Sequence, residues 1–226
     1  MSRQLKSMCG TRETLLGART QLINNARGWM RTAMMQMRGG STSTFHDRLR
    51  ARALADGITI PTHIEAELVA IGTLTVQLRT ADQELKAFAK QHPVCRQLMT
   101  IPGVGPVTAV RFLAALDDVR RFPNAHSVAA YLGLTPGEHS SSERQRRTGI
   151  TKAWPRAVRR TLIQAAWSAF RTATNDPMVR WAEQIALRRG KFVAIVALAR
   201  KMTGVMYALW RDGTTYRPTD WAPTSN

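Results

Sequence analysis

Apolar residues near the start of the chain repeat with a helical period. Between Arg12 and Arg38 two neighbouring series recur every seven positions, Leu15, Leu22 and Trp29 in one and Ile23, Met30 and Met37 in the other. A seven-residue repeat covers two helical turns, so it predicts a long helix with a contact seam. Arginines at 12, 19, 27, 31 and 38 fall within about a third of the circumference at roughly 100° per residue. We predict that they form a basic stripe off the seam.

A second long helix is expected after a break. Gly39 and Gly40 end the first pattern, a polar stretch with Arg48, Arg50 and Arg52 follows, and Pro61 suits a helix start. The next seam consists of Ile64, Ile71, Leu78 and Leu85, with Leu68, Leu74 or Thr75, Ala81 and Phe88 between them. The two helices predict a hairpin or antiparallel coiled coil, within one chain or between two. A structural spacer and a dimerisation element are both compatible with this pattern.

Shorter helices separated by Gly and Pro are predicted after His92. They span 107–116, 127–132, 156–174 and 192–209, with another helix starting at Pro177 behind an Asp176 cap. No strand is predicted. The expected fold is all-α, with a coiled-coil-like hairpin over 1–92, a compact helical domain over 93–212, and a loosely ordered tail over 213–226.

Charge narrows the range of partners. The chain carries a net charge of +18 over 226 residues, so a polyanion is the expected partner. The longest apolar run, 192–199, is too short to span a bilayer, which favours nucleic acid over a membrane. No signal peptide is evident at the start, so we expect a cytoplasmic, nucleoid-associated protein. Two cysteines, Cys9 and Cys95, are too few for a disulfide framework or a zinc site.

A glycine-rich turn over 101–108 is a candidate phosphate site. Glycines at 103 and 105 flank Val104, and Pro102 and Pro106 stiffen the segment. The missing Cβ atoms allow close approach of a ligand, the amides at the next helix start face outward, and Thr108 adds a hydroxyl. The run resembles a helix-hairpin-helix. The alternative interpretation is a tight structural turn between helices.

Three serines at 140–142 precede a dense cluster of basic residues. The cluster comprises Arg144, Arg146, Arg147, Lys152, Arg156, Arg159 and Arg160. A serine nucleophile needs a proton acceptor and cations that stabilise a phosphorane, and these arginines can serve the second need. His139 is adjacent and is one candidate base. A flexible polar loop beside a general nucleic-acid patch remains the alternative. No set of carboxylates has the spacing of a metal site.

Several of these motifs occur in the order of a known family. The segments are Ile101 to Pro106, Arg121-Phe122, Ala129 to Pro136, Ser140-Ser141 and Gly149 to Lys152. Together they resemble the C-terminal domain of the "IS one-ten" insertion-sequence transposases, the DEDD transposases also called bridge-RNA-guided serine recombinases. The stretch Arg19 to Asn24 resembles the start of that family's coiled coil, so the resemblance covers most of the chain.

The resemblance implies a mechanism and partners. A serine would attack the DNA backbone and form a covalent phosphoserine link; alignment with the family places it at Ser141. Ser142 stands where the family has glycine, so Ser140 and Ser142 remain register alternatives. A second departure is Ala153-Trp154-Pro155 after Lys152, where the family has x-Gly-Asn. DNA, a guide RNA and a second copy of the chain are the implied partners.

Family members also carry an N-terminal RuvC-like domain with four acidic ligands for Mg²⁺, and no such tetrad occurs here. The expectation is therefore a truncated transposase that binds nucleic acid but does not recombine alone, with no metal or other cofactor of its own. The alternative is a non-catalytic helix-hairpin-helix protein that binds DNA or RNA. A structural dimer adaptor is disfavoured by the charge.

Overall fold

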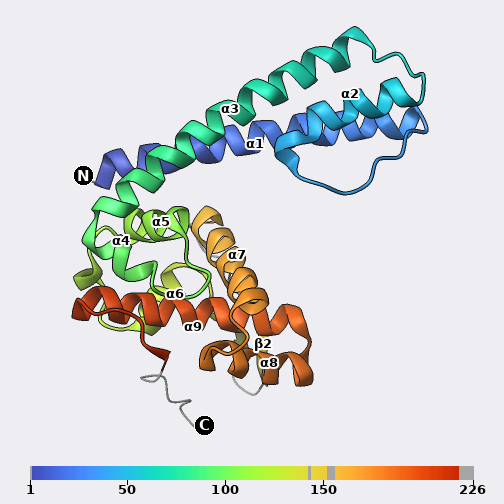
Figure 1. The fold of residues 1–226 in the computed structure, drawn as a ribbon. Helices are drawn as coiled ribbons and strands as arrows, with labels where there is room; N and C mark the ends of the chain where they lie inside the picture. Colours follow the sequence, from blue (N-terminus) through green and yellow to red (C-terminus); the bar gives the residue numbers. More distant parts are fainter. Residues whose placement is uncertain (1, 142–143, 152–155, 219–226) are drawn as a thin grey trace. The chain divides into compact units, whose positions relative to one another are not determined.

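The computed structural model describes residues 2–141, 144–151 and 156–218. Apart from one β-hairpin, its regular elements are helices (Figure 1). The chain divides into two compact units, one of residues Ser7–Glu84 and the other of Met1–Lys6 with Leu85–Asn226. The division falls inside a helix, somewhat before the predicted domain boundary after residue 92. The all-helical class predicted from the sequence is confirmed.

The smaller unit is built on two long antiparallel helices, α1 (Ser2–Thr32) and α3 (Thr62–Gln91). Figure 1 draws them side by side. Side-chain hydrogen bonds link Arg19 to Thr75 and Asn25 to Glu67. Residues later in α1 therefore contact residues earlier in α3, as antiparallel helices require. The buried positions in this part of α3 alternate spacings of four and three, as a seven-residue seam requires: Ile64, Leu68, Ile71, Thr75 and Leu78.

Two of the predicted stripe arginines lie in the seam instead of off it. The Arg12 guanidinium pairs with Asp82, and Arg19 donates to Thr75 Oγ1 over 3.4 Å. Burial and the charge of Arg12 lower the pKa of Arg19, while Asp82 acts in the opposite direction. The continuous basic stripe was therefore wrong for these two residues. On α3, Asp82 holds the seam position that had been predicted for its neighbour Ala81.

A helix that the sequence analysis did not predict covers the pair. Helix α2 (Phe45–Ala55) follows a short 3-10 turn, η1 (Thr42–Thr44), and buries Phe45, Leu49 and Ala53 at intervals of four. These residues join Ile23, Met30 and Ile71 in one apolar cluster. The stretch predicted to be a polar connection is thus a third helix, with its arginines on the outer side of an apolar stripe.

The larger unit is a cluster of helices around α9 (Lys191–Asp212). It contains α4 (Pro93–Leu98), α5 (Pro106–Leu116), η2 (Val119–Arg121), α6 (Ala125–Tyr131), α7 (Arg156–Thr172) and α8 (Pro177–Arg189). Helix α9 packs against α4, α6, α7 and α8. By length and composition α9 alone among the described helices is apolar enough to cross a membrane, but half of its most apolar stretch is buried in this unit. The packing accounts for that composition without a bilayer.

Local caps explain where these helices start. Asn124 Oδ1 accepts from the backbone N–H of Ser127 at the start of α6, and Asp176 Oδ1 accepts from that of Met178 at the start of α8. Pro93, Pro106 and Pro177 each occupy a first helical turn, where a missing N–H costs no helical hydrogen bond. The predicted Asp176 cap is confirmed.

The chain after α9 is attached to the unit as far as Pro218. The Tyr216 hydroxyl lies 3.0 and 2.9 Å from the two Asp176 carboxylate oxygens, and the Tyr216 N–H donates to Thr100 Oγ1. Gln97 Nε2 donates to the carbonyl of Gly213. These bonds differ from the loose tail predicted for 213–218, while residues 219–226 lie outside the described part of the chain.

Candidate nucleic-acid interface and serine hairpin

The glycine turn joins α4 to α5 and rests on α7. Gly103 has φ +81°, and a Cβ built there would lie 2.3 Å from the Ala165 carbonyl oxygen and 2.7 Å from the Ala169 nitrogen. Such a contact is impossible, so only glycine fits between this turn and the α7 backbone. Packing against α7 and the positive φ therefore account for glycine at position 103 without a ligand.

Gly105 differs from Gly103. It is the N-cap of α5, its φ and ψ of −92° and 177° suit any residue, and a Cβ there would meet nothing within 4 Å. Pro106 has no N–H, and the amides of Val107 and Thr108 belong to the first turn, where a helix supplies no partner. No side chain caps this end and no acidic residue occurs in its first turn. The partial positive charge of the helix end is therefore not neutralised locally.

Burial separates the predicted contacts of the turn. Gly103 and Gly105 are partly exposed, whereas Val104 and Thr108 are buried at 5% and 7% exposure. Val104 therefore anchors the turn in the core. The backbone near Gly105 is therefore the part of this turn best placed to contact a phosphate. The assignment of Gly103, Val104, Gly105 and Thr108 together as a phosphate site stays a prediction.

The serine segment forms a β-hairpin, where no strand had been predicted. Strand β1 (Pro136–Ser141) pairs antiparallel with β2 (Arg144–Ile150). Ser141 is the register partner of Arg144, Ser140 of Gln145 and Glu138 of Arg147, with an irregularity between Pro136 and Glu138. Ser141 thus ends β1 beside the connection to β2. Ser142 and Lys152 lie outside the described residues.

The base of this hairpin is fixed to the helices. The Thr151 N–H donates to the Thr135 carbonyl over 2.9 Å, and the Leu134 N–H donates to the Ala129 carbonyl of α6. Leu132 and Leu134 are buried at 0% and 1% exposure. The hairpin therefore projects from a fixed base in the core of the larger unit.

Arg159 lies at this base and Arg111 lies against α7; both are buried, and only Arg159 was predicted as a site residue. Arg159 of α7 donates to the Leu132 carbonyl over 3.5 Å and is 8% exposed; burial, and then the charge of Arg156, lower its pKa. Arg111 of α5 is 3% exposed and lies 3.4 Å from Thr161 Oγ1. A single arginine inside the apolar sequence of α5 was the signal that the sequence analysis overlooked.

Arg159 is thus enclosed by protein, whereas Arg156 and Arg160 on the same helix are exposed. Arg159 brings positive charge to the hairpin base, and the exposed arginines offer theirs to a ligand. For Arg144, Arg146 and Arg147 the structure describes the backbone pairing of β2, which keeps them within one short strand.

Helix α7 brings the two predicted motifs together. Its Arg159 contacts the segment leading into β1, and its Ala165 and Ala169 receive the glycine turn. At 1.5 Å per residue, these contact points lie roughly 10 Å apart along the helix. That separation matches about three nucleotide steps of 3.4 Å along one DNA strand.

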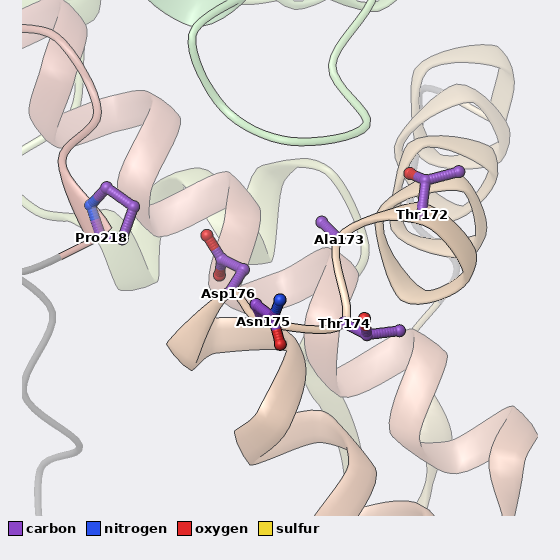
Figure 2. Close-up of a pocket in the computed structure, with 6 residues that line it drawn as sticks. All are labelled: Thr172, Ala173, Thr174, Asn175, Asp176 and Pro218. Atoms are coloured by element: carbon purple, nitrogen blue, oxygen red, sulfur yellow. The ribbon is translucent and has the colours of Figure 1, made fainter.

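The hollow beside the α7–α8 connection offers no comparable chemistry. Its lining includes Thr172, Asn175, Asp176 and Pro218, drawn in Figure 2. Asp176 is its carboxylate, and that group already accepts hydrogen bonds from Met178 and Tyr216. Among the residues that the structure describes, no group of three or more His, Cys, Asp or Glu side chains is placed to hold a metal ion.

Comparison with known proteins identifies relatives of this arrangement. Residues 95–180, which include the glycine turn, the hairpin and all of α7, match the family described as Transposase IS116/IS110/IS902 family. The chain is 30% identical over 219 residues to the "Transposase for insertion sequence element IS1111A" of Coxiella burnetii, with 94% of this chain and 60% of that protein covered.

A second relative is the "Probable family 20 transposase" of Pseudomonas aeruginosa, 30% identical over 226 residues, with 95% of this chain and 65% of that protein covered. A third is the "Putative transposase y4pF/y4sB" of Sinorhizobium fredii, 30% identical over 93% of this chain and 55% of the relative. The chain thus spans between about half and two thirds of the length of these relatives. Over its matched part the chain is similar to transposases of insertion sequences.

Proposed function

We propose that this chain is the DNA-handling and serine-bearing part of an insertion-sequence transposase. The observation that carries the proposal is the seating of the glycine turn and the base of the serine hairpin on one helix, α7. The turn presents an uncapped helix start to a phosphate, and the hairpin carries Ser140 and Ser141 next to a strand rich in arginine. The names of the relatives support DNA transposition as the process.

The chemistry proposed for the hairpin is nucleophilic attack on a DNA phosphate. The Ser141 hydroxyl oxygen forms a bond to phosphorus while the bond to the departing strand oxygen breaks, giving a phosphoserine link. A base must accept the hydroxyl proton, and cations must stabilise the added negative charge. Arg144 is the register partner of Ser141, and Arg159 donates to the Leu132 carbonyl in the segment that leads into the hairpin. Ser140 and Ser142 remain the register alternatives.

A resident Mg²⁺ is not supported by the residues described here, which contain no cluster suited to it. Mg²⁺ bound by a RuvC-like domain, which the family resemblance implies, stays a proposal, and no step above passes through it. The RNA guide and assembly of two copies through the long helices likewise remain proposals. The positive charge of the chain supports a nucleic-acid partner of either kind.

Binding is the first test. Fluorescence anisotropy with a labelled 30-base-pair duplex, repeated at several NaCl concentrations, gives the affinity and its salt dependence. We expect substitution of the exposed Arg156, Arg156→Ala, to weaken binding and to reduce the slope of log K against log salt by about one. The matched control is Arg120→Ala, because the Asp118 carboxylate pairs with Arg120 and offsets its positive charge. Wild-type protein that shows no salt-dependent binding would contradict the proposal.

Covalent chemistry is the second test. The chain is supplied with Mg²⁺, paired DNA sites and, where needed, a separately expressed RuvC-like domain, and the products are run on a denaturing gel. A protein–DNA adduct that forms with wild type and disappears with Ser141→Ala, while duplex affinity is unchanged, supports the nucleophile. An adduct that survives Ser141→Ala but not Ser140→Ala moves the role to Ser140. Binding that persists with no adduct under any condition favours the non-catalytic alternative.

A further inference from the structure

The outer face of α7 carries a line of exposed basic, amide and aromatic side chains. Arg156, Arg160, Gln164, Trp167 and Arg171 follow one another at intervals of three or four residues, so they share one side of the helix. All except the half-buried Trp167 are exposed. Gln164, Trp167 and Arg171 together line a shallow surface hollow. The line begins near the hairpin base and runs toward the end of α7.

Aromatic and basic side chains from the start of α9 meet this line at Trp167. The rings of Trp167 and Phe192 are edge to face, with centroids 6.0 Å apart. Lys191 Nζ lies 5.5 Å from the ring centroids of both Trp167 and Phe170. Phe192 is nevertheless 80% exposed, so packing within this unit does not account for an aromatic residue at this position.

The helix segments that form the site carry basic but no acidic residues. The sequence contains no Asp or Glu from Arg156 to Asn175 or from Gln184 to Arg211. Within these two stretches Arg188 and Arg189 are exposed at the end of α8, next to Leu187, which is 81% exposed. A surface with aromatic rings among cations and no carboxylates fits a polyanion with planar groups.

We propose that Trp167, Phe192, Gln164 and Arg171 form a binding site for an unpaired nucleobase of single-stranded nucleic acid. The base stacks on the exposed aromatic surface, the Gln164 amide offers both a donor and an acceptor to the base edge, and Arg171 and Lys191 contact flanking phosphates. A paired base keeps its face within the duplex stack, so the site discriminates single strands from duplex. The inference extends the proposed nucleic-acid function to a second surface, distinct from the serine hairpin.

The test measures affinity for three fluorescein-labelled 20-mers: single-stranded RNA, single-stranded DNA of the same sequence, and duplex DNA. Phe192→Ala is expected to weaken single-strand binding by roughly 5- to 100-fold and to leave duplex binding within twofold. If Phe192→Ala weakens binding of the RNA 20-mer more than binding of the DNA 20-mer, the site binds a base of RNA, and the reverse result indicates a base of DNA. Because Phe192 is exposed, this variant should unfold at the same temperature as wild type.

Matched variants separate stacking from general apolar contact. Phe192→Trp should retain binding, whereas Phe192→Leu, which keeps an apolar side chain but no ring, should lose it. Leu187→Ala removes an equally exposed apolar side chain near the end of α8 and should have no effect. Equal losses from Phe192→Leu and Leu187→Ala would overturn the stacking proposal, as would equal effects on single strands and duplex.

The hollow itself is tested with a fluorescent base. An oligonucleotide with one 2-aminopurine should show quenched emission on binding, and Trp167→Phe should preserve this quenching while Arg171→Ala weakens affinity. Arg180→Ala, an exposed arginine of α8, is the charge-matched control. If Phe192→Ala and Arg171→Ala both keep wild-type affinity for single strands, the single-strand site is refuted. The proposed function still stands in that case if the wild-type protein binds duplex DNA. Absence of duplex binding in wild type refutes the proposed function instead.

Discussion

The contrast between Gly103 and Gly105 yields a sharp test of the glycine turn. An alanine Cβ at position 103 would lie 2.3 Å from the Ala165 carbonyl oxygen, in a backbone conformation with φ +81°. The conformation costs about 1–2 kcal/mol for an L-residue. Relieving the overlap with the α7 backbone adds about 1–3 kcal/mol. Gly103→Ala should therefore destabilise the larger unit by about 2–5 kcal/mol.

Gly105→Ala should leave stability within about 0.5 kcal/mol, because its backbone is extended and its Cβ has open space. Its effect should appear in binding instead. A methyl group beside the first-turn amides keeps a phosphate from approaching them, and loss of a hydrogen bond to a charged group costs about 1.5–3 kcal/mol. Duplex affinity should fall by roughly 10- to 100-fold.

Thermal unfolding followed by circular dichroism, together with duplex anisotropy, measures both effects. For a unit of this size each kcal/mol shifts Tm by about 2–4 °C, so Gly103→Ala should lower Tm by about 4–20 °C. Wild-type Tm in Gly103→Ala would refute the close approach to α7. Unchanged duplex affinity in a stable Gly105→Ala protein would refute phosphate contact at this helix start and favour the purely structural turn.

Other predictions concern the rest of the fold. Leu49→Ala empties a fully buried position of α2 and should destabilise the smaller unit by about 2–5 kcal/mol in urea unfolding; an equal effect from exposed Leu54→Ala would contradict the assigned stripe. A double-mutant cycle at Arg12 and Asp82 should give a coupling of about 0.2–1 kcal/mol that shrinks in 1 M NaCl, because Asp82 is partly exposed; a larger, salt-insensitive value would indicate a buried pair. Burial and Asp176 raise the pKa of Tyr216 above its usual value of 10, so the attachment of the tail should be complete below pH 10 and weaken as pH rises further. Tyr216→Phe should flatten this alkaline decline of Tm, and an unchanged profile would contradict it.

Helices of the larger unit were predictable because their signals are local. Pro106, Asn124 and Asp176 mark starts by capping or by a missing N–H, and the apolar stripe of α9 follows a regular helical period. Each signal depends on residues within one or two turns. The prediction of helix positions there needed no knowledge of packing.

The missed elements depend on distant partners. Nothing near Arg12 indicates that it lies in the seam, because its partner Asp82 is 70 residues away. In α2 the buried residues Phe45, Leu49 and Ala53 are separated by charged ones, so the segment read as polar. The hairpin at 136–150 lacks an alternating apolar pattern, and its strands are fixed by backbone pairing and by the core at Leu132 and Leu134.

The candidate site was predictable in its residue types but not in its spatial roles. In the sequence Gly103 and Gly105 form an equivalent pair, and only the neighbouring α7 backbone distinguishes the packed glycine from the one with open space. Likewise Arg159 and Arg160 are adjacent in sequence, but one is buried and the other is exposed because they point to different sides of a helix. A role for Trp167 could not be predicted from the sequence, because its contacts with Phe192 and Lys191 exist only in the folded structure.

Three features depend on the number of residues between their contact points on α7: the hairpin base, the seat of the glycine turn and the Trp167 hollow. Insertion or deletion of one residue between Arg159 and Ala165 would rotate everything beyond it by roughly 100° and shift it by about 1.5 Å. The hairpin support, the glycine seat and the Trp167 hollow would lose their common alignment together, even if every side chain involved were kept. A one-residue insertion or deletion in this helix should therefore disturb all three features at once, and engineered chimaeras should join outside it.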